Sequence, residues 1–114
     1  MSTTAQDAVD VARKYLGTKY VYGGADPKKG FDCSGLVQYC YGCVGVNLPR
    51  STGEQINVGT EVSQNNLKVG DLVFPSNGHV GLYTGNGNFI HAPQSGGVVK
   101  EAKVYAFFAG RRVA

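Results

Sequence analysis

The residues of this chain best suited to chemistry are one cysteine and two histidines. Cys33 follows Asp32 at the end of a loop rich in glycine and proline, and the only two histidines, His79 and His91, lie downstream of it. A thiol is a nucleophile as its thiolate, and the unpaired N–H groups at a helix N-terminus lower the pKa of a cysteine placed there. A histidine within reach can accept the thiol proton. The three residues therefore predict covalent catalysis by a thiol, with histidine as the base.

Cys33 is predicted to open a helix. Asp32 is a natural N-cap, because its carboxylate can accept from the free N–H groups of the first turn. The helix is expected to end near Gly45. Its apolar residues recur at helical spacing: Leu36, Val37, Cys40 and Val44.

The two other cysteines, Cys40 and Cys43, are expected to be core residues. They fall in the segment 39–46, which has no charged residue that could activate a thiol. Free cysteine is also among the most buried residue types. The pair lies one helical turn apart, a poor geometry for a disulfide, so we expect a reduced chain.

The composition is that of a small globular protein. Its 114 residues predict one domain, residues 1–114, and 17 glycines indicate many tight turns. The net charge of +3 arises from 11 basic and 8 acidic residues spread along the chain. This charge does not indicate a nucleic-acid partner and only weakly favours an anionic polymer. No stretch is long and apolar enough to span a membrane, and we expect a monomer.

Helices are predicted in the first half of the chain and strands in the second. Residues 4–7 are typical of a capping box, and a helix with one apolar face follows them. Ser51 and Glu54 form a second box, which opens a short helix that stops at Gly59. This order predicts an α+β fold, in which the N-terminal helices pack on an antiparallel β-sheet. The predicted strands cover 72–74, 79–83, 89–92, 98–104 and 105–113.

The two histidines can act together only if they lie on the same face of the sheet. Strand side chains alternate between faces, so the loop length of the hairpin between them decides the matter. A two-residue turn at 86–87 would place the histidines on opposite faces. A three-residue loop at 85–87 would pair Gly81 with His91 and bring His79 to the same face. We predict the three-residue loop or an equivalent bulge.

Four blocks of sequence resemble the NlpC/P60 family of cell-wall cysteine peptidases, and together they span nearly the whole chain. Each block alone is a weak indication, but all four in this order are specific. The resemblance implies a papain-like core and cleavage of peptides in bacterial peptidoglycan, typically at the bond from D-γ-glutamyl to meso-diaminopimelate or lysine. The blocks are Tyr20 to Gly24, Phe31 to Val37, Leu48 to Ser51 with Gln55, and Val69 to Phe74 followed by His79 to Tyr83 and Phe89 to Ala92.

The resemblance also implies roles for the three chemical residues. Cys33 resembles the family nucleophile, His79 the general base and His91 the polar residue that orients the base. His79 would take the thiol proton and later give it to the leaving amine, while His91 holds the His79 ring as a neutral acceptor. The backbone N–H of Cys33 is a candidate oxyanion donor.

Four further residues are candidates for contact with the substrate. By resemblance, Tyr20 would bond near the oxyanion, and Asp32 and Ser34 would bind a free substrate amine. Asp32 can cap the helix at the same time. Arg50 could bind a substrate carboxylate or pair at the surface. The expected partners are bacterial peptidoglycan or its muropeptides.

Three other functions stay open. Cys33, His79 and His91 could ligate zinc, although the chain lacks ligand pairs at short spacing, and we expect neither a metal nor another cofactor. A non-catalytic wall-binding module would have no use for the three residues. A thiol-dependent amidase or acyltransferase would apply the same chemistry to another substrate.

A wall substrate would place the protein outside the cell or facing the wall. The first residues lack the basic and apolar regions of a signal peptide, so export would need another route or a leader segment outside this sequence. A cytoplasmic location also stays open.

Overall fold

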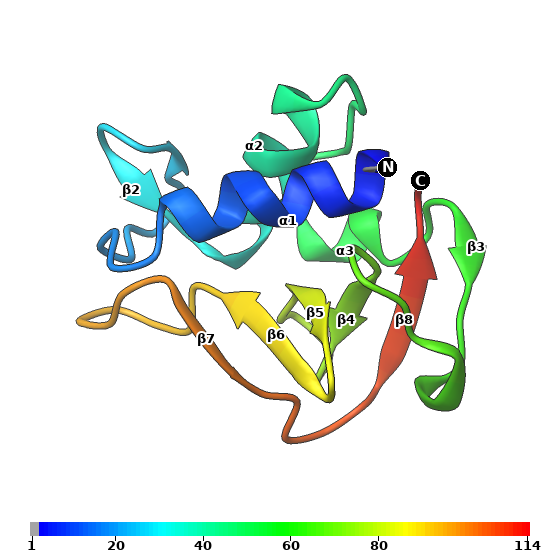
Figure 1. Cartoon of the computed structure of the whole chain (residues 1–114). Helices are drawn as coiled ribbons and strands as arrows, with labels where there is room; N and C mark the ends of the chain where they lie inside the picture. Colours follow the sequence, from blue (N-terminus) through cyan, green and yellow to red (C-terminus); the bar gives the residue numbers. More distant parts are fainter. Residues whose placement is uncertain (1–2) are drawn as a thin grey trace.

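The chain packs α1 and α2 against one side of an antiparallel β-sheet (Figure 1). The computed structural model describes residues 3–114. The helices are α1 (Thr4–Lys14), α2 (Cys33–Cys43) and α3 (Thr52–Gln55), and a 3-10 turn, η1, spans Gln64–Asn66. The predicted α+β fold is confirmed, because all three α-helices precede the strands of the main sheet.

Six strands form the main sheet in the order β3-β8-β4-β5-β6-β7, and all neighbours are antiparallel. A separate two-stranded ribbon, β1 (Ala25–Asp26) and β2 (Gly30–Phe31), precedes α2. Strand β8, the last of the chain, lies between β3 and β4. The strands are β3 (Thr60–Glu61), β4 (Leu72–Phe74), β5 (Gly81–Gly85), β6 (Asn88–His91), β7 (Lys100–Lys103) and β8 (Ala109–Arg112).

Two of the predicted helix caps are confirmed. The Asp32 carboxylate accepts from the Gly35 N–H at 2.7 Å, which makes Cys33 the first residue of α2. Ser51 Oγ accepts from the Glu54 N–H at 3.3 Å and donates to the Glu54 carboxylate at 2.9 Å. Each cap supplies a partner for an N–H group that has none within its own helix.

Several predicted boundaries differ from the structure, and the strands predicted over 98–104 and 105–113 are the shorter β7 and β8. The cap of α1 is Thr3, one residue before the predicted box, and α3 ends at Gln55 rather than Gly59. β5 begins at Gly81, so His79 lies in the loop before the strand. The backbone N–H of His79 donates to the Ser76 carbonyl in a local turn, which explains why the ladder starts later.

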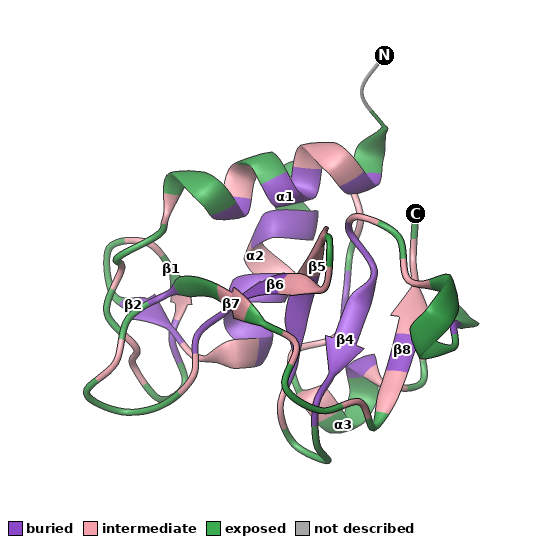
Figure 2. Cartoon of the chain, turned by 60° about the horizontal axis from the view of Figure 1, so that its bottom comes forward, coloured by how far each residue is buried: buried purple, intermediate pink, exposed green. Residues whose placement is uncertain are grey.

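The core lies between the helices and the sheet. Figure 2 shows buried residues on the inner side of α1 and α2 and along β4 and β6. Cys40 is buried, as predicted, but Cys43 is exposed, so its assignment to the core is wrong. The last turn of α2, with Gly42 and Cys43, lies outside the packed layer. The core includes Ala8, Val9, Ala12, Leu36, Val37, Leu72, Phe74, Leu82 and Ile90.

The β5–β6 hairpin combines a short turn with a bulge. Its two turn residues, 86–87, both have positive φ, as a type I′ turn requires. The pairing then shifts by one residue between Tyr83 and Gly85. Beyond the bulge Leu82 pairs with Ile90, which is the register that a three-residue loop would have produced. The three-residue loop is therefore absent from this hairpin, and the alternative bulge is confirmed.

This register brings Gly81 against His91. A Cβ atom at position 81 would lie 2.4 Å from Phe89 Cδ2 and 2.9 Å from His91 Cβ. Both distances are too short for carbon atoms in contact. The absence of a side chain at Gly81 is thus what lets the two rings pack beside it.

Replacement of Gly81 by alanine is expected to lower the free energy of unfolding by about 1–3 kcal/mol, because overpacking displaces the neighbouring atoms. Gly42→Ala is the matched control, since a Cβ there meets nothing within 4 Å. Alanine at this helical position is expected to raise the free energy of unfolding by about 0.5–1 kcal/mol. Urea denaturation measures both values. An unchanged midpoint for Gly81→Ala would contradict the close packing described here.

Candidate active site

Cys33 lies in the first turn of α2, next to the cap. Its thiol is partly buried and donates to the Gly78 carbonyl at 3.8 Å, and the backbone N–H of Val80 acts to lower its pKa. Burial is the largest influence on this thiol and raises its pKa, and the Asp32 carboxylate acts in the same direction. Cys33 is therefore a protonated thiol at neutral pH, although its position in the sequence predicted a lowered pKa. A base must remove the proton when the thiol reacts.

His79 and His91 form a hydrogen-bonded pair. Nε2 of His79 and Nδ1 of His91 are 2.8 Å apart. His91 is only 3% exposed, and its ring stacks on Phe89 with the centroids 4.2 Å apart. Burial lowers the pKa of His79, and burial together with His79 and Lys100 lowers the pKa of His91 to about 4. Both rings are neutral at neutral pH, so within the pair one nitrogen donates and the other accepts.

The segment 78–80 connects the thiol to the histidine pair. The Cys33 sulfur bonds to the backbone carbonyl of Gly78, its pKa is influenced by the N–H of Val80, and His79 lies between these two residues in the chain. Two cavities meet at Gly78: one of about 450 Å³ is lined by Cys33, and one of about 510 Å³ is lined by both histidines. The thiol thus lines one cavity and the histidines line its neighbour, and we call the two cavities together the cleft.

All four predicted substrate-contacting residues line the Cys33 side of this cleft, and three of them form one bonded cluster. Arg50 donates to Ser34 Oγ at 2.8 Å, to Asp32 Oδ2 at 2.9 Å and to the Gly24 carbonyl at 3.2 Å. The Ser34 hydroxyl and two backbone N–H groups also donate to Asp32, so each of its carboxylate oxygens accepts two bonds. The four lining residues are Tyr20, Asp32, Ser34 and Arg50.

The cluster keeps Asp32 ionised. Burial by itself would raise the pKa of this carboxyl group, but Arg50 and the backbone N–H groups of Gly35 and Gly23 hold the pKa below its usual value. Asp32 and Arg50 therefore form an ion pair at neutral pH, and their charges cancel within the wall of the cleft.

Tyr20 is the fourth residue on this side. Burial and the neighbouring Cys33 and Asp32 raise the pKa of its phenol, so the hydroxyl keeps its proton and can donate. The backbone N–H of Tyr20 donates to the Gly97 carbonyl at 2.9 Å, which fixes the segment at the edge of the cleft.

Gln55 supports the site, although the sequence analysis assigned it no role. Gln55 is fully buried, and its amide nitrogen donates to the carbonyls of Ser34 at 3.1 Å and Pro49 at 2.9 Å. It ties the segment that carries Arg50 to the first turn of α2. In the sequence, this role was indicated only by the position of Gln55, four residues after the Ser51 cap on a short helix.

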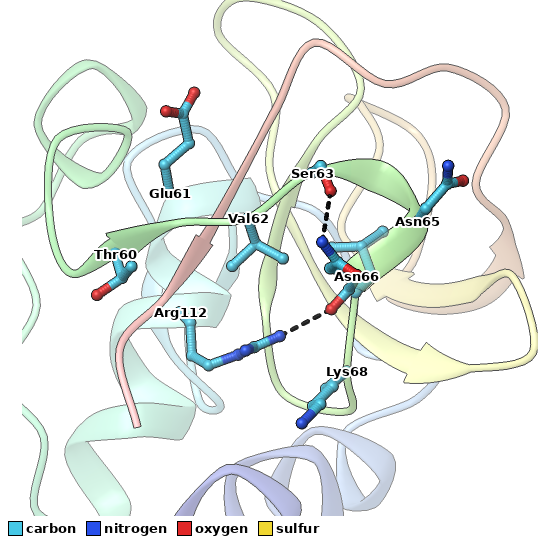
Figure 3. A pocket seen from close by; sticks show the side chains of 9 residues that line it. Thr60, Glu61, Val62, Ser63, Asn65, Asn66, Lys68 and Arg112 are labelled. Carbon is cyan, nitrogen blue, oxygen red and sulfur yellow. Dashed lines mark hydrogen bonds between the residues drawn. The ribbon is translucent and has the colours of Figure 1, made fainter.

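A further cavity, of about 430 Å³, lies between β3, η1 and β8 (Figure 3). Arg112 is the arginine in its wall, and it is held by the Asp71 carboxylate at 2.8 Å and the Asn66 carbonyl at 2.8 Å. Neither a thiol nor an imidazole lines this cavity. It therefore lacks the groups needed for thiol catalysis.

Residues 3–114 lack two features. In that part of the chain, no three cysteine, histidine or carboxylate side chains are grouped so that they could hold a metal ion. The helices described there include none with the length and apolar character needed to cross a membrane.

A family model and individual relatives match this chain over most of its length. The family model described as NlpC/P60 family matches residues 17–113. The γ-DL-glutamyl hydrolase of Bacillus subtilis is 46% identical over 101 residues, which cover 82% of this chain and 24% of that protein. The murein DD-endopeptidase MepS/murein LD-carboxypeptidase of Escherichia coli K12 is 46% identical over 96 residues, which cover 80% of this chain and 50% of that protein.

Solved structures agree with these sequence matches. The NlpC/p60 domain of the peptidoglycan hydrolase SagA superposes with a TM-score of 0.89 at 40% identity, and the match covers 96% of this chain and 98% of that one. By contrast, the chain spans only 24% and 50% of the two longer relatives.

Native alkylation is expected to separate the three cysteines. Iodoacetamide should label Cys33 and the exposed Cys43, while the buried Cys40 stays unlabelled. The rate at Cys33 should keep rising beyond pH 8.5, about the usual thiol pKa, because burial raises the pKa of this thiol. His79→Ala should slow labelling at Cys33 and leave Cys43 unchanged. Peptide mapping by mass spectrometry reports each site, and a Cys33 rate that levels off in the acidic range would contradict the protonated state.

Proposed function

The chain belongs to the NlpC/P60 family, and on that basis we propose that it is a cysteine peptidase that hydrolyses stem peptides of bacterial peptidoglycan. One observation carries the proposal: a cysteine at a helix start and a neutral histidine pair line two cavities that share Gly78 in their walls. Cys33 is the proposed nucleophile, His79 the base and His91 the residue that orients the base.

In the proposed mechanism His79 removes the Cys33 proton as the sulfur attacks. Nε2–H of His79 donates to Nδ1 of His91, which leaves the Nδ1 lone pair of His79 to accept the thiol proton. The sulfur bonds to the substrate carbonyl carbon, and the imidazolium then gives its proton to the leaving amine as the C–N bond breaks. A water molecule deprotonated by His79 hydrolyses the thioester, and the thiol regains its proton.

His91 acts through His79. As a neutral acceptor it keeps the His79 proton on Nε2, and its own pKa of about 4 prevents it from taking up the proton that catalysis moves. The stack on Phe89 and the β6 backbone hold the ring in place. The hydrogen bond between the rings strengthens when His79 becomes an imidazolium, because one partner is then charged.

Two donors are proposed for the oxyanion that forms when the sulfur attacks. The backbone N–H of Cys33 is at the start of α2, where N–H groups lack partners within the helix. The Tyr20 hydroxyl lines the same cavity and stays protonated. The acyl part of the substrate would thus lie on the Cys33 side of the cleft.

The bond proposed is the one from D-γ-glutamyl to diaminopimelate or lysine. The name of the Bacillus relative, γ-DL-glutamyl hydrolase, supports this choice. The Escherichia relative is named for DD bonds and for LD-carboxypeptidase activity, which are the competing outcomes. Action on peptidoglycan would place this monomeric enzyme at the wall or outside the cell.

The cluster of Asp32, Ser34 and Arg50 shapes the acyl side. We assign Arg50 a positioning role, because its bonds to the two other side chains use both of its terminal nitrogens. Asp32 already accepts four bonds, so it has little capacity left for a substrate ammonium group. This favours an endopeptidase that does not depend on a free amine.

Defined muropeptides test the reaction. The wild type is expected to release a fragment ending in D-glutamate from a tetrapeptide stem, while Cys33→Ala and His79→Ala lose detectable turnover. His91→Asn should retain part of the activity, since an amide oxygen can accept the orienting bond, whereas His91→Leu should lose about a hundredfold or more. Mass spectrometry identifies the bond.

The same assay separates the alternatives. Equal losses for Asn and Leu at position 91 would argue against orientation through His91. A product in which the acyl group is joined to a new amine would indicate an acyltransferase, and turnover that survives in Cys33→Ala would contradict thiol catalysis.

Acetylation of the substrate tests the amine subsite without changing the enzyme. The Asp32 carboxylate already accepts four hydrogen bonds within the protein. An N-acetylated stem peptide should therefore be cut with kcat/KM within about tenfold of the peptide with a free amine. A charge-assisted bond to a free amine would instead make the difference about ten- to a hundredfold. A loss in that larger range would restore Asp32 as the amine-binding residue.

A further inference from the structure

Lys100 lies directly across from His91 on the neighbouring strand. The register of β6 and β7 pairs these two residues. Residues directly opposite each other in an antiparallel pair project from the same face of the sheet, with their Cβ atoms about 5 Å apart. Lys100 and Ala102, two positions apart on β7, both line the cavity that His79 and His91 line.

Among the described residues, 3–114, Lys100 is the only one with a formal charge in the wall of this cavity. None of the ion pairs formed by residues 3–114 involves it. Its neighbour Glu101 projects from the other face, where it binds Arg13 at 2.6 Å and the Thr84 hydroxyl at 2.6 Å. The cavity wall contains no aspartate or glutamate. This side of the cleft therefore offers an ammonium group without a counterion of its own.

The proton that His79 gives to the leaving amine shows which part of the substrate lies beside Lys100. A general acid has to lie within hydrogen-bond reach of the leaving amine. The residue that leaves must therefore lie on the histidine side of the cleft, next to Lys100. The acyl side is different, because there the charges of Asp32 and Arg50 cancel.

We propose that Lys100 binds a carboxylate on the leaving residue and so favours substrates whose released amine carries one. Diaminopimelate has such a group on its side chain, which lysine lacks, and any stem that ends at this residue has a second one at its chain terminus. This inference rests on the proposed peptidase function and adds to it a determinant of specificity.

Three substrates distinguish the two carboxylates: L-alanyl-γ-D-glutamyl-meso-diaminopimelate, its side-chain amide and its chain-terminal amide. Lys100→Gln is expected to lower kcat/KM on the unmodified tripeptide by about tenfold, the effect of one charge-assisted bond near the surface. The amide that removes the bound carboxylate should lower wild-type activity by the same factor and show no further loss in Lys100→Gln. Lys100→Arg should retain most of the activity, because the charge is kept.

Lys103→Gln is the matched control, since Lys103 is on the same strand but outside the cavity wall. It should leave all three rates unchanged. An equal loss on every substrate in Lys100→Gln, or no loss at all, would overturn the assignment while leaving the peptidase function intact. If the wild type cleaves none of the three in a Cys33-dependent manner, the proposed function fails and this inference fails with it.

Discussion

The register between β5 and β6 is the constraint on which the site depends. The bulge between Tyr83 and Gly85 shifts the pairing by a single residue, and a shift of one residue moves every later side chain to the opposite face of the sheet. With this shift, Gly81 stands beside His91 and the loop before β5 brings His79 within hydrogen-bond distance of it. Without it, Leu82 rather than Gly81 would stand beside His91, and the space that the two rings use would be filled by a side chain.

Burial determines the charge state of the assembled groups. Desolvation disfavours the thiolate of Cys33 and the imidazolium forms of His79 and His91 alike, so these three groups are uncharged at neutral pH. The helix N-terminus and the Val80 N–H favour a negative sulfur, but burial outweighs them in the free enzyme. In the proposed mechanism the reactive ion pair therefore forms in step with attack on the substrate, when the developing oxyanion and the transferred proton compensate each other.

The two sides of the cleft differ in their electrostatics. On the Cys33 side, the charges of Asp32 and Arg50 neutralise each other. Gln55 stabilises this cluster, because its amide donates to the Ser34 carbonyl in the first turn of α2. On the histidine side, Lys100 has no partner among the described residues. A peptide with an anionic group at one end only would bind across such a cleft in one direction. Its anionic end would lie on the histidine side, because only that side has an unpaired positive charge. Under the proposed function, this asymmetry would place the leaving residue on the side from which His79 delivers the proton.

The sequence by itself determined the features that depend on short-range bonds. Asp32 predicted the start of α2, and so the place of Cys33, because a cap and the N–H it binds are only three residues apart. The order of helices and strands, and the blocks that resemble the NlpC/P60 family, predicted the fold class correctly.

Only the tertiary structure decided the features that depend on contacts between distant segments. The choice of a bulge over a longer loop, the exposure of Cys43, the bonds from Arg50 to Asp32 and the place of Lys100 opposite His91 all belong to this group. A turn of two or three residues is locally acceptable, and its sequence allows both. The register is settled by the burial of Leu82 and Ile90 against the helices, a free energy that appears only when the whole core packs.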